Sequence, residues 1–236
     1  MNFKGKNIYS EQTFKNPSFI KRFSHNRRFG LSVKLISPKN NDNILDYGTG
    51  DGHILTQLHK INNNCRLSGF EPIQKINIDK NIKIYDNVDD IHSNFNKICC
   101  FEVMEHLTYE NQKKELNNMK SLLDKDGILI ISVPIENGLS SFFKNIIRIL
   151  LKQKHPNTSF STLFKSLFSI PINRGKKDYI FSHIGFYFKD LENVFNEVDL
   201  KIEKKIFSPF LFSKSILNSQ IFYILKPKSL IKKLKN

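Results

Sequence analysis

The stretch ILDYGTGDGHIL, residues 44–55, joins an apolar run to an amphipathic segment through an acid and three alternate glycines. A strand that ends in glycines and turns into a helix is typical of loops that bind nucleotides or other anions, because backbone N–H groups at the start of the helix point at the ligand. Glycines also let the backbone approach a ligand closely and adopt positive φ angles. The stretch therefore predicts a strand, a ligand-binding loop and a helix over residues 53–61.

The glycine spacing does not fit the dinucleotide fingerprint G-x-G-x-x-G. Counted from Gly48, the third glycine would fall at His53. Counted from Gly50, it would fall at Leu55. Glu71, however, lies 19 positions after the last loop glycine, close to the spacing of about 20 at which an acid binds a ribose in Rossmann-type sites. These features favour a ribose-bearing cofactor and argue against an NAD enzyme.

Apolar runs alternate with helical patterns between residues 43 and 134, which predicts a mostly parallel sheet with helices on both faces. The expected strands cover 44–47, 65–71, 82–85, 96–102 and 128–133, and the expected helices cover 53–61, 112–123 and 188–198. Asp126 and Gly127 are expected to form a turn. Residues 200–207 and 220–225 could close the sheet as an antiparallel pair.

The net charge of +15 resides in three segments, residues 1–34, 137–177 and 201–236, while the rest of the chain is net acidic. A compositional bias toward Lys would explain this charge without any function. The alternative is that the three segments together attract an anionic partner. Both interpretations stay open.

The three cysteines, two of them adjacent at Cys99 and Cys100, do not suggest a disulfide framework and favour a reducing compartment. No apolar run reaches the roughly 18 residues that span a bilayer, and the N-terminus lacks the pattern of a signal peptide. We therefore expect a cytoplasmic protein, with a peripheral contact to the anionic inner membrane surface left open.

Taken together, these motifs resemble the class I S-adenosylmethionine-dependent methyltransferases, in the small-molecule branch that includes ubiquinone-biosynthesis O-methyltransferases and cell-envelope glycan methyltransferases. The resembling segments are ILDYGTGDG, GFEP, NKICCFEVMEHL with its E-x-x-E-H run, KSLLDKDGILIISVP and HIGFYFKDLENVFNEVDLKIEK. The resemblance implies a Rossmann-like α/β fold, with a seven-stranded, mostly parallel sheet, one antiparallel strand and a helical insertion after the fifth strand. It divides the chain into a basic helical cover, residues 1–40, and a methyltransferase domain, residues 41–236, with an insertion at 137–180.

The resemblance also implies that S-adenosylmethionine lies across the carboxyl ends of the first two strands. Asp46, Gly48 and Gly50 would surround its methionine part, and Glu71 would bind its ribose. Asp86 and Asn87 would lie near the adenine. The full set of expected cofactor-binding residues is Asp46, Tyr47, Gly48, Gly50, Gly52, Glu71, Pro72, Asp86, Asn87, Phe101 and Glu102.

Two histidines are candidates for catalysis, His106 in FEVMEHL and His183 in FSHIGFYF. A hydroxyl acceptor needs a base, and histidine has a suitable pKa. If a helix starts at Glu102, then Glu102, Glu105 and His106 project to one side and could hold a divalent metal, although no metal is expected. Bracing of the sheet edge is the alternative for His106, and substrate contact or packing is the alternative for His183.

We expect methyl transfer to a small-molecule, lipid-linked or nucleotide-linked acceptor, most simply a hydroxyl of a sugar or a quinone-type compound. The basic amphipathic segment 139–155 could cover the acceptor, contact a membrane or simply pack on the sheet. An RNA methyltransferase is an alternative prompted by the charge, but the fourth strand ends in FEVM rather than in the N/D-P-P-aromatic motif, so no nucleic-acid partner is expected. A non-catalytic interaction domain is a further alternative, and the oligomeric state is open.

Overall fold

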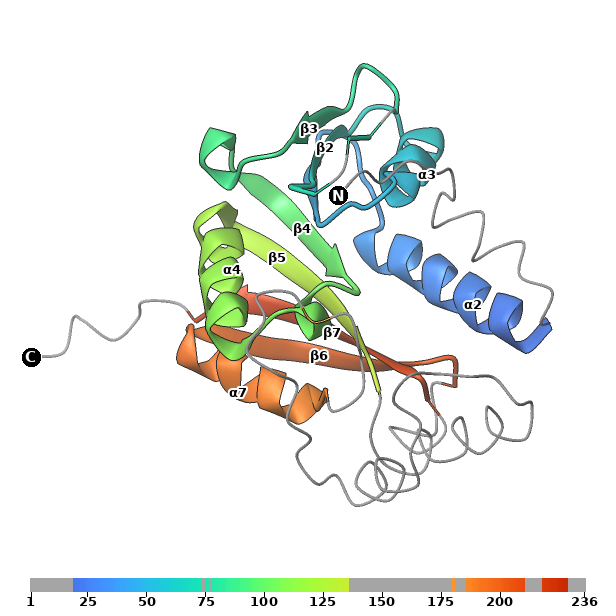
Figure 1. Ribbon diagram of the computed structural model, residues 1–236. Helices are drawn as coiled ribbons and strands as arrows, with labels where there is room; N and C mark the ends of the chain where they lie inside the picture. The colour runs from blue at the N-terminus through green and yellow to red at the C-terminus, as the bar shows by residue number, and fades with distance from the viewer. Residues whose placement is uncertain are drawn as a thin grey trace, which may run out of the picture. The chain divides into compact units, whose positions relative to one another are not determined.

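The computed structural model describes residues 19–73, 75–76, 78–135, 180, 186–210 and 218–228. Seven strands form one sheet in the order β3-β2-β1-β4-β5-β7-β6 (Figure 1). The strand order reverses at β1, which pairs in parallel with both β2 and β4. In open α/β sheets, ligands bind beyond the carboxyl ends of the strands at such a reversal. The chain divides into two compact units, which are described in turn.

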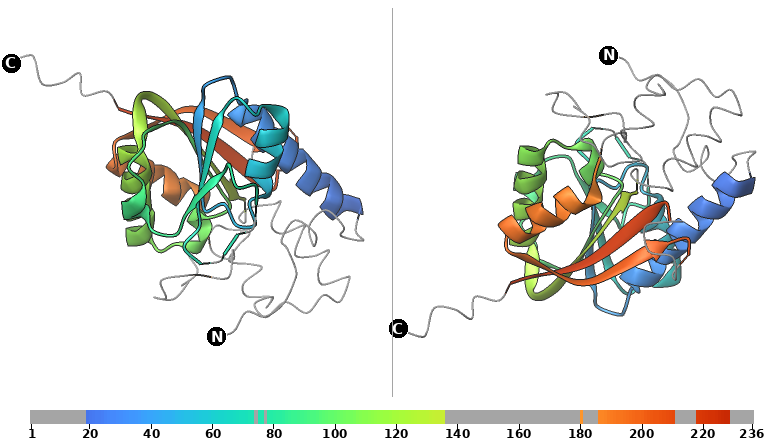
Figure 2. Two further views of the ribbon diagram at one scale, coloured as in Figure 1. Left: turned by 90° about the horizontal axis from the view of Figure 1, so that it is seen from above. Right: turned by 90° about the horizontal axis from the view of Figure 1, so that it is seen from below.

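The first unit comprises Met1–Cys100 and Leu122–Gly127. Its helix α2 packs beside α3 (Figure 2). The parallel register places Asp46 of β1 opposite Gly69 of β2 and opposite Cys99 of β4. The elements are α2 (Phe19–Ile36), β1 (Asn43–Tyr47), α3 (His53–Ile61), β2 (Arg66–Phe70), β3 (Lys83–Tyr85), the 3-10 turn η1 (Val88–Asp90) and β4 (Phe95–Phe101), whose last residue belongs to the second unit.

The core of the first unit forms because β1 and β4 are apolar on both faces, as parallel strands covered by helices must be. Leu55 and Leu58 of α3 are fully buried, which matches the apolar face that the sequence predicts for this helix. The other fully buried apolar side chains of these elements are Ile36, Ile44, Leu45, Phe95, Ile98, Cys99 and Cys100.

The second unit comprises Phe101–Ser121 and Ile128–Asn236. Its strand β7 runs antiparallel to both neighbours, β5 and β6, and its helices α4 and α7 pack against each other. The elements are the 3-10 turn η2 (Met104–His106), α4 (Tyr109–Ser121), most of β5 (Leu123–Pro134), α7 (Phe188–Glu197), β6 (Leu200–Ser208) and β7 (Gln220–Pro227).

The predicted fold class is confirmed: the sheet has seven strands, is mostly parallel and contains one strand antiparallel to its neighbours. The predicted turn at Asp126 and Gly127 is wrong, because β5 already begins at Leu123. A Cβ at Gly127 would lie 3.0 Å from the carbonyl oxygen of Phe95. Gly127 therefore allows the backbone of β5 to lie close to Phe95. The pairing of β5 with its neighbours outweighs the local preference of Asp126 and Gly127 for a turn.

Several expectations fall outside the described residues. They concern the helical pattern at 139–155, nearly all of the insertion at 137–180, and His183. Of the expected cover over residues 1–40, the structure describes the part from Phe19 onward. None of the helices that are described is long and apolar enough to cross a membrane.

Candidate functional site

The loop after β1 depends on its three glycines. Gly48, Gly50 and Gly52 have φ angles of 81°, 59° and 73°, in the left-handed region that other L-residues rarely adopt. A Cβ at Gly52 would lie only 2.8 Å from Cγ2 of Ile78. The loop would therefore have to change shape if its glycines were replaced.

The end of β2 holds this loop in place. The backbone N–H groups of Gly48 and Thr49 donate to the carbonyl of Phe70, at 2.8 and 3.1 Å. Gly69 permits this approach, because a Cβ there would lie 2.8 Å from Cγ2 of Thr49 and 2.9 Å from Cδ1 of Leu55. Sequence reasoning missed Thr49 and Gly69, although a glycine inside a strand is a signal for close approach of neighbouring groups.

Glu71 is joined to the glycine loop by a hydrogen bond. Its Oε2 accepts a hydrogen bond from the N–H of Gly50 at 2.9 Å, and its Oε1 accepts one from the N–H of Ile73 at 3.0 Å. The residue is 8% exposed and its own N–H donates to the carbonyl of Tyr85 at 2.9 Å. The carboxylate is thus held at the carboxyl end of β2, beside the loop.

Asp46 is buried beneath the loop. Its Oδ2 accepts a hydrogen bond from the Thr49 hydroxyl at 2.7 Å, and its Oδ1 accepts a weak one from the Cys99 thiol at 3.5 Å. Burial raises the pKa of Asp46 to about 6, an effect that these two bonds oppose and that the charges of Glu71 and Asp51 reinforce. Burial, together with Asp46, also raises the pKa of the Cys99 thiol well above its usual value, which makes it a poor nucleophile.

Helix α2 contacts the residue that starts α3. The ring centroids of Phe29 and His53 lie 4.7 Å apart. The N–H of His53 donates to Oδ1 of Asp51 at 3.2 Å. Burial lowers the pKa of His53 more than the charge of Asp51 raises it. The sequence predicted a basic helical cover over residues 1–40 without identifying this contact.

The remaining residues of the first unit that were expected to bind the cofactor lie at the end of a strand or just after one. Tyr47 is buried, with its ring centroid 4.6 Å from that of Phe70. Asp86 and Asn87 are exposed after β3, where the Asn87 side chain accepts from the N–H of Asp89 at 3.2 Å and starts η1. Pro72 is exposed after Glu71.

Glu102 of the second unit adopts an unusual conformation directly after β4. Its φ is 56°, so no helix starts there, and the predicted helical alignment with Glu105 and His106 is wrong. Its N–H donates to the carbonyl of Ser132 at 3.1 Å, and its Oε1 accepts a hydrogen bond from Nε2 of Gln220. The conformation costs roughly 1–2 kcal/mol for a non-glycine residue, and β5 and β7 supply the bonds that hold it.

His106 lies in η2 and is fixed by Ile180. Its Nδ1 lies 2.7 Å from the carbonyl oxygen of Ile180, whose N–H donates to the carbonyl of His106 at 2.8 Å. A carbonyl oxygen can only accept, so Nδ1 carries a proton, and whenever the imidazole is neutral its lone pair is on Nε2. This is the tautomer that a general base at Nε2 requires.

The E-x-x-E-H run does not form a metal centre in the part of the chain that is described. Glu105 is fully buried, and no group of three His, Cys, Asp or Glu residues there is placed to hold a metal ion. Phe101, the other expected cofactor residue of this unit, has its ring centroid 6.1 Å from that of Phe222.

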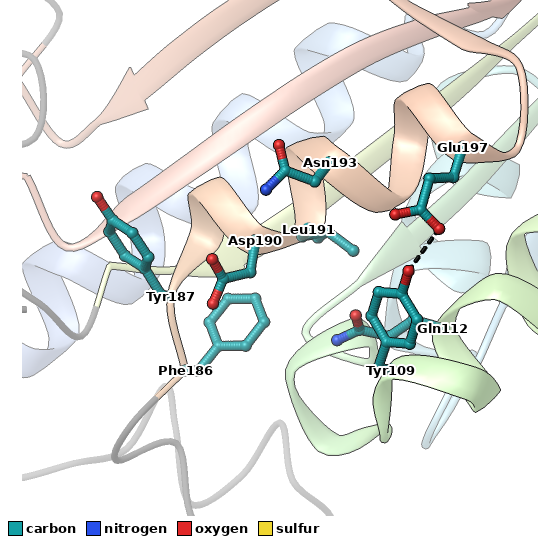
Figure 3. A pocket seen from close by; sticks show the side chains of 8 residues that line it. All are labelled: Tyr109, Gln112, Phe186, Tyr187, Asp190, Leu191, Asn193 and Glu197. Carbon is teal, nitrogen blue, oxygen red and sulfur yellow. Dashed lines mark hydrogen bonds between the residues drawn. The ribbon is translucent and has the colours of Figure 1, made fainter. Parts of the chain in front are cut away.

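A cavity of about 380 Å³ lies between α4 and α7 (Figure 3). Across it, the hydroxyl of Tyr109 donates to Oε2 of Glu197 at 2.5 Å, and Lys113 pairs with the same oxygen at 3.1 Å. Burial raises the pKa of Asp190. The sequence did not predict this cavity, which is lined by Tyr109, Gln112, Phe186, Tyr187, Asp190, Leu191, Asn193 and Glu197.

Comparison with known proteins identifies the family. Residues 18–203 match the family described as "Methyltransferase domain", so the chain belongs to this family. It is an enzyme that transfers the methyl group of S-adenosylmethionine. No curated protein matches the sequence.

Solved structures share the fold at low sequence identity. A TehB-like S-adenosylmethionine-dependent methyltransferase from Corynebacterium glutamicum is 14% identical with a TM-score of 0.53, over 93% of this chain and 94% of that one. The magnesium protoporphyrin IX methyltransferase of Synechocystis, solved with S-adenosylmethionine, is 10% identical with a TM-score of 0.55, over 92% and 89%. A mycolic acid cyclopropane synthase, solved with S-adenosylhomocysteine, is 10% identical with a TM-score of 0.55, over 90% and 87%.

Proposed function

We propose that this chain methylates a hydroxyl group of a small-molecule, lipid-linked or nucleotide-linked acceptor, with His106 as the base. The observation that best supports binding of the methyl donor is the hydrogen bond from the N–H of Gly50 to Glu71. It holds a carboxylate directly beside the glycine loop. Gly52 fits the same purpose, since its φ of 73° favours glycine and a Cβ there would lie 2.8 Å from Cγ2 of Ile78.

The residues of the first unit suit S-adenosylmethionine. A carboxylate has about four acceptor positions, so Glu71 can bind the loop and both ribose hydroxyls. Asp46, Gly48 and Gly50 are assigned to the methionine part, and Asp86 with Asn87 to the adenine. When bound, the cofactor supplies an electrophilic methyl carbon on a sulfonium, whose C–S bond electrons return to sulfur.

We assign to His106 the removal of the hydroxyl proton of the acceptor. The Ile180 carbonyl keeps the proton on Nδ1, so Nε2 can accept the hydroxyl proton as the acceptor oxygen forms its bond to the methyl carbon. The chain otherwise contributes alignment and exclusion of water, which account for most of the acceleration in such a displacement. His183 is assigned to contact with the acceptor.

The binding of the donor is testable by calorimetry. Wild-type protein should bind S-adenosylmethionine and not NAD. Glu71→Ala should weaken binding by about 10-fold or more, the value of a hydrogen bond to a charged group. Glu110→Ala removes an exposed acid of α4 and should leave the affinity unchanged. A folded protein without affinity for S-adenosylmethionine would refute the proposal.

The acceptor can be identified by a thermal-shift screen with nucleotide sugars, quinone precursors, polyprenyl phosphates and, as the competing class, RNA oligonucleotides. His106→Gln should abolish product formation on the acceptor found, while S-adenosylmethionine still binds. Retained activity in this variant would remove His106 from the mechanism.

We also propose a peripheral contact with an anionic membrane through residues 137–177, which contain eight Lys or Arg and no Asp or Glu. Basic segments bind anionic lipid by a force that salt weakens. Flotation with phosphatidylglycerol vesicles should therefore recover the protein at low salt and not at high salt. Absence of binding at low salt would refute this contact.

A further inference from the structure

The cavity between α4 and α7, to which the proposed function assigns no role, has an acidic lining in a basic chain. The chain contains 37 Lys or Arg against 22 Asp or Glu. Among the described residues that line the cavity, two are acids, Asp190 and Glu197, and none is Lys or Arg. Its volume of about 380 Å³ is that of a site for a small molecule. The charge of the lining therefore favours a small cationic ligand.

The Glu197 end of the cavity already has its counter-charge within the protein. Oε2 of Glu197 accepts a hydrogen bond from the Tyr109 hydroxyl at 2.5 Å and pairs with Nζ of Lys113 at 3.1 Å. These two partners lower the pKa of Glu197, because they stabilise its ionised form. A cationic ligand would therefore gain little at this end.

The Asp190 end of the cavity has no such counter-charge. Figure 3 shows Asp190 with Phe186 and Tyr187 at this end and Glu197 with Tyr109 at the other. Within the described part of the chain, no hydrogen bond or ion pair reaches the Asp190 carboxylate, and partial loss of hydration alone raises its pKa. The residue is exposed, so a ligand can reach it. A ligand cation would supply the missing partner.

The other groups that line the cavity also suit a cation. The amide nitrogen of Gln112 donates to the carbonyls of Met104 and Leu107, which uses both of its hydrogens and leaves the amide oxygen to accept from a ligand. Nζ of Lys189 lies 5.8 Å from the centroid of the Tyr187 ring, within the range of cation–π attraction. This ring thus already attracts an ammonium group of the chain.

A structural role of Asp190 explains only part of this arrangement. An acid in the first turn of a helix interacts favourably with the helix dipole, and Asp190 lies in the first turn of α7. That role concerns α7 alone, whereas the cavity also includes Tyr109 and Gln112 of α4. Stabilisation of the helix predicts a lower melting temperature when the charge is removed, and no change in the binding of a ligand.

We propose that the cavity between α4 and α7 binds a small primary amine, whose ammonium group pairs with Asp190 and whose apolar body lies against Phe186 and Tyr187. An ammonium group has three hydrogen-bond donors and no acceptor, which complements a carboxylate and an amide oxygen. The proposed site lies wholly within the second unit. It goes beyond the proposed function, because it requires neither S-adenosylmethionine nor an acceptor hydroxyl.

An NMR titration of the full chain with butylamine tests this site, with 1-butanol as the matched neutral probe. Butylamine is protonated at pH 7, as a lysine side chain is, and should shift amide signals of α4 and α7. Wild-type protein should bind it at least about 5-fold more tightly than 1-butanol, and Asp190→Asn should remove this preference. Tyr187→Leu should weaken amine binding by about 2- to 5-fold, the value of a cation–π contact.

Asp199→Asn is the matched control. Asp199 is an exposed acid just after α7 that does not line the cavity, and asparagine tolerates its positive φ of 58°. This variant removes the same charge from the same unit and should bind butylamine as wild type does. An equal loss of affinity in Asp190→Asn and Asp199→Asn would assign the binding to the net charge and overturn the proposal.

The remaining outcomes are equally decisive. The proposal is overturned if wild type binds butylamine no better than 1-butanol, or if Asp190→Asn lowers only the melting temperature. Where Asp190→Asn does not fold, Tyr187→Leu decides: weaker amine binding supports the site, and unchanged binding overturns it. Loss of amine binding in Glu71→Ala would place the amine at the glycine loop and also overturn it. None of these outcomes depends on the binding of S-adenosylmethionine, so the proposed function stands or falls separately.

Discussion

Asp46 is a buried acid of the candidate site, and its burial reduces the stability of the folded chain. It is 3% exposed beneath the glycine loop, and burial raises its pKa to about 6 despite the hydroxyl of Thr49. An ionised carboxylate in this position is unfavourable for folding, because few groups replace its hydration. The proposed role of Asp46 beside the cationic methyl donor accounts for a cost that the fold alone does not require.

The pH dependence of stability tests this interpretation. As the pH falls below about 6, the folded chain takes up a proton at Asp46, while the unfolded chain does so only near 3.8. The folded state therefore gains stability from this group as the pH falls from 7 to 4, by roughly 2.4 kcal/mol. Urea unfolding of wild type and Asp46→Asn from pH 4 to 7.5 measures it. The advantage of the variant at pH 7 should disappear at pH 4, and parallel curves would contradict the assignment.

The site residues that could be proposed from the sequence belong to a local pattern, whereas those that were missed depend on contacts between distant parts of the chain. Asp46, the three glycines and Glu71 could be proposed as one site from the sequence because they form one local pattern around two strand ends. Gln220 lies 118 positions from Glu102, which it contacts, and a lone glutamine has no periodicity that marks it. The left-handed φ of Glu102 results from bonds to β5 and β7, so the helical alignment expected there could not be corrected from the sequence.

At the scale of elements, β1 is anchored to β4 by a charged group just before it begins. The carboxylate of Asp42 pairs with Nζ of Lys97 at 2.6 Å and accepts hydrogen bonds from Asn96 and from the N–H of Lys39. Burial raises the pKa of Asp42, but the bonds to Lys97, Lys39 and Asn96 outweigh it and lower the pKa overall.

Removal of this carboxylate should destabilise the first unit strongly. Asp42→Ala removes the carboxylate partner of Lys97, whose side chain is only 14% exposed and which then keeps its bond to the Ser37 carbonyl. The free energy of unfolding should therefore fall by about 2–4 kcal/mol. Glu203→Ala breaks an exposed pair with Lys201 and should change it by less than about 1 kcal/mol. Denaturant unfolding compares them, and equal losses would show that the Asp42 pair is no stronger than a surface pair.

Two glycines offer a second matched comparison between elements. A Cβ at Gly69 of β2 would lie 2.8 Å from Cγ2 of Thr49 in the loop, which is too close. A Cβ at Gly30 of α2 would meet nothing within 4 Å. Gly69→Ala should therefore cost about 1–3 kcal/mol of stability and weaken S-adenosylmethionine binding. Gly30→Ala should stabilise α2 by roughly 0.5–1 kcal/mol. Thermal melts and calorimetry decide, and a Gly69→Ala protein with normal affinity would show that the loop adapts.

Elements with a strong periodic pattern were predicted best. The helix expected at 53–61 is α3, His53–Ile61, because its apolar spacing and the preceding glycine specify both face and start. The helix expected at 112–123 is α4, Tyr109–Ser121. Its last two predicted residues, Leu122 and Leu123, are apolar in either state, and Leu123 joins β5 instead. The point at which α4 ends and β5 begins depends on pairing with strands that are distant in the sequence. A local sequence pattern does not contain this information.

At the scale of the whole molecule, the sequence predicted the sheet and its class of cofactor, whereas the acceptor stays a proposal. Alternation of strands and helices restricts the topology to a few arrangements, and the order found is among them. An acceptor site has no comparable constraint, because methyltransferases of one fold act on different compounds. The solved neighbours include enzymes named for a magnesium porphyrin and for mycolic acid cyclopropanes.

The charge of the whole chain leads to a final prediction. A net charge of +15 on 236 residues makes the folded state repel itself, and the repulsion falls when salt screens it. The melting temperature at pH 7 should therefore rise between about 0.05 and 0.5 M potassium chloride, where the Debye length shortens from roughly 14 to 4 Å. Raising the pH toward the isoelectric point of 9.6 should lessen this salt effect, because lysines lose charge. A melting temperature that falls with salt would mean that ion pairs such as Lys97 with Asp42 outweigh the repulsion.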